Sequence, residues 1–366
     1  MWLDKKTGRL ISLDFMRGLI MVLLMLESTY LYSHLNEFFP TGLGHLIFRQ
    51  FEHHRWHGLR FWDLIQPGFM YIAGVAMAFS LHRQKRDGKN WNERFRKSLR
   101  RSGWLFFWGV LDYAVRGDHL SFELWDVLTQ LSFTTLVAFL IFEWKYSQQA
   151  LAGIGLLLLT ELLYRYTNIP GFDQPFTDQH NFGNYVDLLL MNKINSGGWV
   201  AINALPTAIH TIAGAMVGKW MIEAASDRER IRWIIYAGLT TLIVGYLQDI
   251  TGLTPIIKRI ATTSFTLVTA GYCLLATALF YWWIDMKEHH RGLWFFTIVG
   301  MNSLFIYLFF EIVGHRWFNE YVYVFTDNLL AFMPRFPMKI LGALVIFALE
   351  WGLCWFLFKK KIFFKV

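Results

Sequence analysis

Charged residues are scarce in this sequence, and cysteine is almost missing from it. Only 17% of the 366 residues are Asp, Glu, Lys or Arg, whereas 55% are hydrophobic and 18% are aromatic. A soluble domain of this size would alternate apolar with charged positions, so the composition leaves no room for a sizeable soluble domain. The chain has two cysteines, Cys273 and Cys354, and both lie inside apolar stretches. Neither a disulfide framework nor a thiolate metal site is therefore expected.

The formal net charge is +8, but the basic residues lie in the connections between apolar stretches. They do not form patches with interleaved aromatic residues along one face, which is the pattern typical of nucleic-acid binding. We therefore interpret the positive charge as a signal of membrane topology and expect no nucleic-acid partner. We also expect no cleavable signal peptide, because polar residues interrupt the first apolar stretch.

Apolar stretches near the length of a bilayer span recur along the whole chain. They predict an all-α, polytopic membrane helix bundle of about ten transmembrane helices, formed by residues 1–366 as a single domain. The mean hydropathy of +0.33 agrees with this class. The predicted spans are residues 15–35, 61–81, 98–116, 122–142, 148–166, 198–222, 231–250, 262–284, 293–314 and 337–358.

The distribution of Lys and Arg predicts the orientation of the bundle. The connection over residues 82–101 is strongly basic and is expected on the cytoplasmic side, together with both termini. The segment around His53 and the loop over residues 166–197 then lie on the far side. Lys258 and Arg259 depart from this pattern, because they fall in a connection that the count places outside. They indicate a local role or a re-entrant segment. The basic residues of the cytoplasmic connection are Arg83, Lys85, Arg86, Lys89, Arg94, Arg96, Lys97, Arg100 and Arg101.

Titratable residues gather at residues 52–74, EHHRWHGLRFWDLIQPGFMYIAG, where an apolar stretch begins. His53, His54 and His57 can exchange protons near neutral pH, and Asp63 opens the predicted helix. Asp63 would serve equally well as a capping carboxylate at the helix start. The histidines do not have the spacing that places two ligands on one helical face, so we expect no metal.

Further polar residues lie inside the predicted spans. Glu27 and Ser28 precede the end of the first span, Asn203 and His210 share one face of the sixth, and Asn302 lies in the ninth. Hydrogen bonds between helices would explain each of them separately. Together they predict a polar cavity through the bundle, with Asn203 and His210 in its lining. Other polar residues of this kind are Asp14, Arg17, Asp126, Gln130, Ser303 and Glu350.

Several motifs occur in an order that is similar to one known family. They are LDFMRG, HHRWHGLRFWDLIQPGFMYIAGVAMAFSL, WDVLTQLSF, NSGGWVAINALPTAIHTIAG, TPIIKRIATTSFTL and VGMNSLFIYLF. This series resembles the heparan-α-glucosaminide N-acetyltransferase family and its bacterial relatives. The resemblance implies that acetyl-CoA binds from the cytoplasm and that the acetyl group passes to an amino sugar on the far side. It also implies that His53 is the essential histidine, in register with Trp56 and Gly58. Ser28 stands where the family has an asparagine.

The residues themselves are compatible with this chemistry. Acyl transfer needs a base for the proton of the acceptor and a donor for the oxyanion. His53 could be that base, with Glu27 or Asp63 fixing its tautomer. Asn203, Asn302 or a backbone amide could be the oxyanion donor. Transfer through an acetyl group carried on His53 and direct transfer both stay open.

Both substrates need binding groups. Arg100 and Arg101, at the mouth of the third span, are the expected partners of the phosphates of acetyl-CoA. Ser28, Trp56, Asn203, His210 and Asn302 are the expected contacts of the acceptor. The polar exported loop is a further candidate for holding a sugar, through Asp173, Asp178, His180, Asn181, Asn184 and residues 195–199.

A secondary transporter for a sugar or sugar acid is the alternative function, since a bundle with a polar midplane would serve it too. A receptor without chemistry would leave the histidines unexplained. We expect an integral protein of the bacterial inner membrane that contacts lipid, and the resemblance implies a homodimer. The identity of the acceptor, and whether nitrogen or oxygen is acylated, stay open.

Overall fold

The computed structural model describes residues 10–115 and 120–364. Its regular structure over these ranges is helical; no strand is found there, apart from an isolated bridge between His57 and Ile257. The prediction of an all-α fold is therefore confirmed for the part of the chain that the structure describes. Each range predicted as a span overlaps at least one helix.

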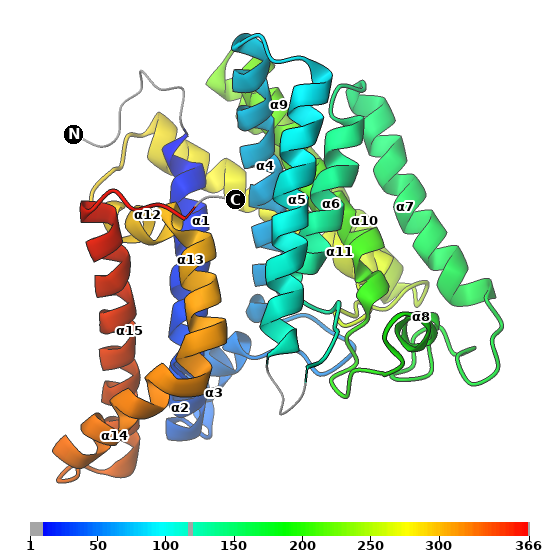
Figure 1. Cartoon of the computed structure of the whole chain (residues 1–366). Coiled ribbons are helices and arrows are strands. Elements are labelled where there is room, and N and C mark those ends of the chain that lie inside the picture. The colour runs from blue at the N-terminus through cyan, green and yellow to red at the C-terminus, as the bar shows by residue number, and fades with distance from the viewer. Residues whose placement is uncertain (1–9, 116–119, 365–366) are drawn as a thin grey trace. The chain divides into compact units, whose positions relative to one another are not determined.

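The chain divides into two compact units. Unit 1 comprises residues 1–53, 60–62 and 283–365, and unit 2 comprises residues 54–59 and 63–282, with residue 366. Unit 1 thus joins the first part of the chain to the last, which Figure 1 draws in blue and in yellow to red. That residues 1–366 act as one functional domain stays a prediction.

Unit 1 is organised around α1 and the carboxy-terminal helices (Figure 1). Gly18 of α1 lies so close to α12 that a Cβ there would come within 2.0 Å of the carbonyl oxygen of Phe296. The span that begins with α12 is broken at Asn302, where the helix bends by 75°. The helices are α1 (Ile11–Ser28), α2 (Leu31–Phe38), α3 (Gly42–Phe48), the short η2 (Arg49–Phe51), α12 (Trp294–Met301), α13 (Ser303–Leu308), the π-helix η6 (Phe309–Phe318), α14 (Asn319–Leu329) and α15 (Arg335–Lys359).

The first predicted span, residues 15–35, covers two helices and not one. α1 ends at Ser28, and Tyr30 adopts a left-handed conformation with φ 63° before α2 begins. A tyrosine rarely takes this conformation, so the break is imposed by packing and could not be read from the apolar pattern. Glu27 and Ser28 consequently form the end of a helix.

Unit 2 has α4 and α9 at its centre. Gly74 and Gly214 let the two backbones approach, because a Cβ at these positions would lie 2.1 Å from the Thr211 oxygen and 2.0 Å from the Tyr71 oxygen. Small residues commonly allow such close crossings in membrane bundles. Two of its helices cross a unit boundary: Phe61 and Trp62 of η3 are counted with unit 1, and the π-helical η5 continues past the start of unit 1. The helices are η3 (Phe61–Leu64), α4 (Ile65–Arg86), α5 (Trp91–Ala114), α6 (Val127–Ile141), α7 (Tyr146–Tyr166), α8 (Phe182–Met191), η4 (Ala201–Asn203), α9 (Ala204–Glu223), α10 (Asp227–Ile250), α11 (Thr263–Phe280) and η5 (Tyr281–Met286).

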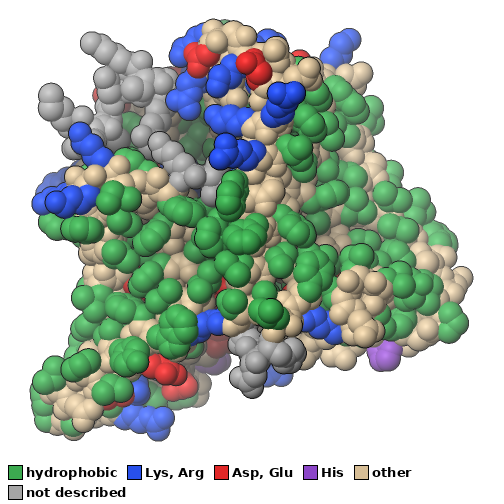
Figure 2. Space-filling model, in the orientation of Figure 1, with side chains coloured by type: hydrophobic (Ala, Val, Ile, Leu, Met, Phe, Trp, Pro, Cys, Tyr) green, Lys and Arg blue, Asp and Glu red, His purple; other side chains and the backbone are tan. Residues whose placement is uncertain are grey.

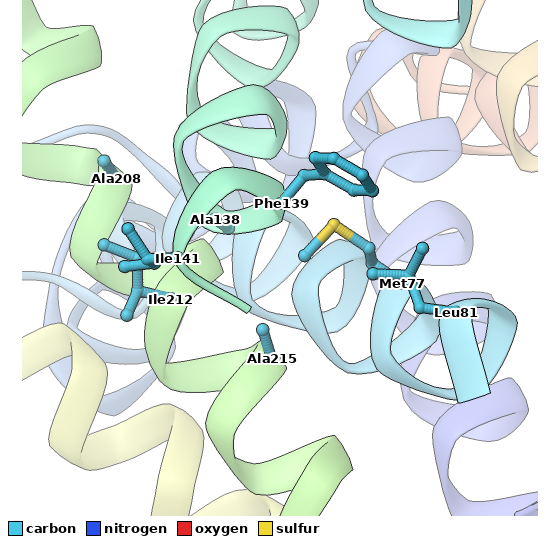
Figure 3. Packing of buried hydrophobic residues seen from close by; sticks show 8 residues of the cluster. All are labelled: Met77, Leu81, Ala138, Phe139, Ile141, Ala208, Ile212 and Ala215. Carbon is cyan, nitrogen blue, oxygen red and sulfur yellow. The ribbon is translucent and has the colours of Figure 1, made fainter. Parts of the chain in front are cut away.

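An apolar cluster joins α4, α6 and α9 inside unit 2. Phe139 of α6 and Met77 of α4 lie in contact range beside the small side chain of Ala215, as Figure 3 shows. Alternation of large and small side chains lets the three helices pack closely. The cluster consists of Met77, Leu81, Ala138, Phe139, Ile141, Ala208, Ile212 and Ala215.

Membrane character is clear from several of these helices. Five are long and apolar enough to cross a bilayer, and a sixth span is added if the broken pair of residues 294–301 and 303–329 counts as one. Figure 2 shows hydrophobic side chains over the outward faces of α5 and α7; among them are Phe106, Phe107, Leu151, Leu158 and Leu162. About ten spans, and cytoplasmic termini, stay predictions.

Candidate functional site

The backbone of His53 is fixed within unit 1 by its neighbours. Arg60 donates from Nη1 to the His53 carbonyl oxygen at 3.2 Å, and the same atom lies 3.4 Å from Oε2 of Glu52. The other oxygen of Glu52 accepts from Asn36 Nδ2 at 2.6 Å. His53 itself is half-buried. An ion pair thus holds the chain on both sides of this histidine, while part of its side chain stays accessible.

The end of α1 reaches the same neighbourhood through Tyr32. The Tyr32 ring stacks on Phe51 at 4.4 Å between centroids and meets Trp62 edge-on at 5.3 Å. The Tyr32 hydroxyl donates to the Leu23 carbonyl of α1 at 3.3 Å. One buried tyrosine therefore connects α1 with the residues that flank His53 in unit 1. Sequence reasoning missed Tyr32, because nothing in its local pattern separates it from an interfacial aromatic residue.

Ser28 is buried, and its polar groups are occupied. Its hydroxyl donates to the Met25 carbonyl at 2.8 Å, within its own helix. Its carbonyl accepts from Asn319 Nδ2 at 2.8 Å, so α14 is tied to the end of α1. Ser28 therefore shapes the helix end beside Glu27, and direct contact with a substrate stays a proposal.

Asp63 belongs to unit 2 and forms a buried ion pair there. Its Oδ1 lies 3.6 Å from Lys258 Nζ, and its Oδ2 accepts from the backbone N–H of His54 at 3.3 Å. The side chains of both members of the pair are nearly inaccessible, at 0% for Asp63 and 4% for Lys258. This pair gives Lys258, which did not fit the charge pattern, a local role. It also gives Asp63 a second role besides the one expected toward His53.

Gly58 of the H-x-x-W-x-G segment is required by its surroundings. Its φ of +137° is unfavourable for other residues, and a Cβ would lie 2.7 Å from Nε2 of His54. Its N–H donates to the Ile256 carbonyl at 2.9 Å. Beside it, His57 Nε2 lies 2.7 Å from Oδ1 of Asp249. His54 is thus packed on the glycine of this segment.

Trp56 anchors this segment to the loop over residues 166–197. Its indole N–H donates to the Phe176 carbonyl at 2.8 Å. A Cβ at Gly198 would lie 3.0 Å from the Trp56 ring and 2.6 Å from Oδ1 of Asp178. Trp56 was expected at the acceptor site, and the structure gives it a definite packing role in unit 2.

Arg259 and Trp199 lie next to the Asp63–Lys258 pair. The Arg259 guanidinium lies 4.7 Å from the centroid of the Trp199 ring, and Lys258 Nζ lies 5.3 Å from it. Arg259 donates to the Gly197 carbonyl, and its own carbonyl accepts from Asn203 Nδ2 at 2.7 Å. Burial lowers the pKa of Arg259. The charge anomaly at residues 258–259 was the sequence signal for this cluster, although it did not reveal the partners.

The remaining acceptor candidates, His210 and Asn302, each have hydrogen-bond partners within their own unit. His210 is fully buried in α9, with Nε2 2.8 Å from the Thr269 hydroxyl. Asn302 in unit 1 donates to the Ile362 carbonyl at 3.1 Å and accepts from the Phe364 N–H at 3.1 Å. Asn302 thus ties the last described residues to the break of its helix. A role as oxyanion donor would require it to release these bonds.

Several polar residues of the loop over residues 166–197 stabilise α8. Asn181 and Asn184 form a reciprocal cap at the start of that helix. Asp187 is fully buried and accepts from Trp125 Nε1 at 2.9 Å and from the Ala201 N–H at 2.8 Å. Burial raises the pKa of Asp187 to about 7. Part of the polarity that was assigned to sugar binding is therefore structural.

The basic connection between α4 and α5 is largely exposed (Figure 2). Arg94 is the buried exception and donates to Glu143 at 2.8 Å, which holds the pKa of that carboxyl below its usual range. Arg100 is exposed and Arg101 is half-buried at the start of the apolar part of α5. Exposed cations of this kind can meet the phosphates of a nucleotide. Within residues 10–115 and 120–364, no group of three His, Cys, Asp or Glu side chains has a metal-binding arrangement.

The predicted site residues are divided between the two units. Those of unit 1 are Glu27, Ser28, His53 and Asn302, and those of unit 2 are Trp56, Asp63, Arg100, Arg101, Asn203 and His210.

Comparison with known proteins agrees with the ordered motifs. No family model matches the chain. Among curated proteins, heparan-alpha-glucosaminide N-acetyltransferase of Mus musculus is 22% identical over 422 aligned residues. The alignment covers 98% of this chain and 61% of the mouse protein, so the chain spans about three fifths of its relative's length. The resemblance expected from the motifs is thereby confirmed as a distant relationship, and it extends over nearly the whole chain.

Proposed function

We propose that this protein is an integral membrane acetyltransferase. It moves an acetyl group from cytoplasmic acetyl-CoA to an amino or hydroxyl group of a hexosamine-type sugar on the far side of the membrane. The observation that carries the proposal is the end-to-end similarity to a membrane N-acetyltransferase, combined with the half-buried His53 in the segment held by Arg60 and Glu52. Neither a receptor nor a scaffold needs such a histidine.

His53 acts in this proposal as the general base. The acceptor nitrogen or oxygen attacks the thioester carbonyl, His53 takes the proton of the acceptor, and the C–S bond breaks to release CoA as its thiol once the sulfur gains a proton. Glu27 fixes the tautomer of His53 in this proposal. In the other route, His53 carries the acetyl group transiently before the acceptor attacks. Both routes depend on this one side chain.

The donor is held from the cytoplasmic side. The exposed Arg100, with Arg101 at its side, offers the phosphates of acetyl-CoA charge-assisted hydrogen bonds. Arg94 is not available for this role because Glu143 occupies it. The acceptor sugar is held by Ser28, Trp56, Asn203, His210 and Asn302 in this proposal, after some of their present hydrogen bonds exchange.

Asp63 supports the site from within unit 2. Its carboxylate holds the His54 N–H, one residue after His53, and is itself held by Lys258. A residue that fixes the neighbouring peptide in this way acts as a positioning residue.

The same proposal places the protein in a bacterial inner membrane, where it contacts lipid and forms a homodimer.

A transporter for a sugar or sugar acid is the second candidate, and one observation favours it. The helix from Trp294 to Leu329 is broken at Asn302 and bent by 75°. Broken spans often line the substrate sites of secondary transporters. A transporter moves its substrate unchanged and needs no acetyl donor, so the two candidates differ in their products.

The test incubates the purified full chain with labelled acetyl-CoA and a panel of amino sugars and N-acetyl sugars. Wild type is compared with His53→Asn and with His82→Asn, which changes an exposed histidine of α4. We expect transfer by wild type and by His82→Asn, and a loss of about 100-fold or more in His53→Asn. The acceptor that becomes labelled defines the substrate class.

The same preparations are reconstituted in liposomes and supplied with labelled sugar. Accumulation of unmodified sugar without acetyl transfer would contradict the acetyltransferase and support the transporter. Equal transfer by wild type and His53→Asn would leave the enzyme class intact and refute the role of His53.

A further inference from the structure

Glu350 is a buried carboxyl group that its surroundings do not satisfy. It lies in α15 and is fully buried, and neither of its two oxygens has a hydrogen-bond partner among residues 10–115 and 120–364. Its helix is among those long and apolar enough to cross a membrane. An ionised carboxylate without donors is very costly in such a place, and such a group usually binds a proton instead. The proposed acetyl transfer makes no use of Glu350.

A second acceptor without a donor faces the same point. The Oδ1 atom of Asn319 is buried and has no partner within the described part of the chain. A Cβ built on Gly314 would lie 3.5 Å from Oε1 of Glu350 and 3.7 Å from Oδ1 of Asn319. Both oxygens therefore border the same Cβ position of a residue that has no side chain. Gly314 belongs to the π-helix η6, and such helices are frequent at functional sites.

One added hydrogen would satisfy this arrangement. A protonated Glu350 has an O–H group that can donate, and Asn319 Oδ1 is the buried acceptor on the same side of Gly314. An ionised carboxylate has no hydrogen to donate. It therefore cannot form a hydrogen bond with Asn319 Oδ1, which is also an acceptor. The geometry thus favours the acid form for the state that the structure represents.

We propose that Glu350 and Asn319 form a proton-binding site in unit 1, and that its occupancy controls the hydrogen bond from Asn319 to the end of α1. With the proton bound, Asn319 accepts from Glu350 and donates from Nδ2 to the Ser28 carbonyl, as observed at 2.8 Å. When the proton leaves, the carboxylate requires a donor, and a flip of the Asn319 amide supplies Nδ2. The Ser28 carbonyl then faces Oδ1 and loses its donor.

The proton site therefore acts on the helix end that carries Glu27. Ser28 directly follows Glu27 in the chain, and its carbonyl is one of the last of α1. Helix ends leave carbonyl groups that need a donor from elsewhere, and here Asn319 supplies it. Loss of that bond is expected to loosen residues 25–33. The proposal needs neither acetyl-CoA nor a sugar, so it stands or falls independently of the acetyltransferase.

Other titratable groups on the elements that pack with Glu350 influence the pH at which the proton leaves. Two of the acids are already paired, Asp327 with Lys339 at 2.6 Å and Asp14 with Arg17 at 2.9 Å. Those on α1, α2, η6, α14 and α15 are Asp14, Arg17, Glu27, Tyr32, His34, Glu37, Glu311, His315, Arg316, Glu320, Tyr321, Tyr323, Asp327, Arg335, Lys339, Cys354 and Lys359, and α12 has none.

The test combines infrared spectroscopy with hydrogen exchange on the full chain in lipid nanodiscs, from about pH 6 to about pH 10. Glu350→Gln keeps the shape of the side chain and its ability to donate to Asn319, but cannot ionise. Asp327→Asn is the matched control, because it neutralises a half-exposed, paired carboxylate of the same unit. The infrared signal is the carbonyl stretch of a protonated carboxylic acid, and exchange is followed in a peptide covering residues 25–33.

Asp187 is also expected to contribute to the acid band near pH 6, so the signal of Glu350 is the difference between variants. We expect a larger acid band at low pH in wild type and in Asp327→Asn than in Glu350→Gln, and loss of this difference as the pH rises. Over the same pH interval, exchange of the peptide, corrected for intrinsic rates, should accelerate about five-fold in wild type, as expected for one lost hydrogen bond. It should not accelerate in Glu350→Gln.

Three results would overturn the proposal. An acid band at about pH 6 that is equally large in wild type and in Glu350→Gln would mean that Glu350 is ionised. A band that changes when sodium replaces choline at constant pH would identify a metal cation as the ligand. Identical exchange in wild type and Glu350→Gln at every pH would refute the control of the α1 end.

Discussion

Asp63 in unit 2 and Glu350 in unit 1 are both fully buried carboxyl groups, and their surroundings differ completely. Asp63 has a buried lysine 3.6 Å away and accepts a backbone N–H. Glu350 has no donor at either oxygen. A buried carboxyl group can therefore be stabilised in two ways within one chain, by a countercharge or by a bound proton.

The two solutions suit different tasks. An ion pair such as Asp63–Lys258 fixes the segments that carry it, and removal of one member leaves an uncompensated charge. A carboxyl group without a countercharge can gain and lose a proton at a lower structural cost. The contrast predicts that substitutions at the first site damage stability, whereas substitutions at the second change its response to pH.

Lys258→Met should have the largest effect of the variants considered. It leaves Asp63 buried without its countercharge, and we expect a loss of about 3 to 5 kcal/mol in unfolding free energy. Thermal unfolding in detergent, followed by circular dichroism, measures it. The double variant Lys258→Met with Asp63→Asn should recover much of the loss, because no buried charge then remains. A double variant as unstable as the single one would contradict the ion-pair interpretation.

Asp187 is an intermediate case, since it has two donors and no countercharge. Burial raises its pKa to about 7, so the folded protein binds this proton more tightly than the unfolded chain. Stability should therefore fall as the pH rises from about 4 to about 7, by roughly 4 kcal/mol at most, and stay at the lower level above that.

Melting temperature against pH measures this for wild type, Asp187→Asn and the control Asp173→Asn, which alters an exposed residue of the same loop. The decline should vanish in Asp187→Asn and persist in the control. An unchanged pH profile in Asp187→Asn would show that Asp187 is ionised throughout.

Gly58→Ala tests whether the close packing of Gly58 against His54, whose N–H binds Asp63, stabilises the protein. The new methyl would collide with the His54 ring, 2.7 Å away, in a backbone conformation with φ +137°. We expect a loss of about 2 kcal/mol. Gly88→Ala is the matched control, because Gly88 also has a positive φ, +79°, but nothing within 4 Å. Its loss should be about 1 kcal/mol, from backbone strain alone. Equal losses would mean that contact with His54 is unimportant.

Glu350→Gln should have the smallest effect on stability, within about 1 kcal/mol of wild type near neutral pH. It replaces a neutral acid by a neutral amide of nearly the same shape. Asp63→Asn removes the partner of a buried lysine and should be clearly more damaging. Melting temperatures of the two variants, measured side by side, make the comparison direct. A Glu350→Gln variant as unstable as Asp63→Asn would show that Glu350 has a structural role like that of Asp63.

The helices could be predicted from the sequence because an apolar stretch of sufficient length is a local signal. The break after α1 could not, since it depends on Tyr30 taking a left-handed conformation under the constraints of its neighbours. The same limit applies to Asn302, whose partners at residues 362 and 364 lie far along the chain. Such contacts leave no periodic pattern.

The candidate site was predicted in part. The segment around His53 was identified by its density of titratable residues, and Lys258 was identified as an anomaly of charge. The partner of Lys258 could not be deduced, because many acids were available and pairing is a property of the folded chain. Tyr32 and Asn319 were missed altogether, since a tyrosine near a membrane surface and an asparagine near a helix end have common structural explanations.

The most direct test of the account compares acetyl transfer by His53→Asn and His54→Asn, two substitutions at adjacent positions. His54 packs on Gly58 and its N–H holds Asp63, whereas His53 is the proposed base. The account predicts a loss of about 100-fold or more in the rate of transfer for His53→Asn, at an unchanged melting temperature. His54→Asn should keep its transfer activity and melt at a lower temperature. Loss of transfer in His54→Asn with normal transfer in His53→Asn would contradict the account.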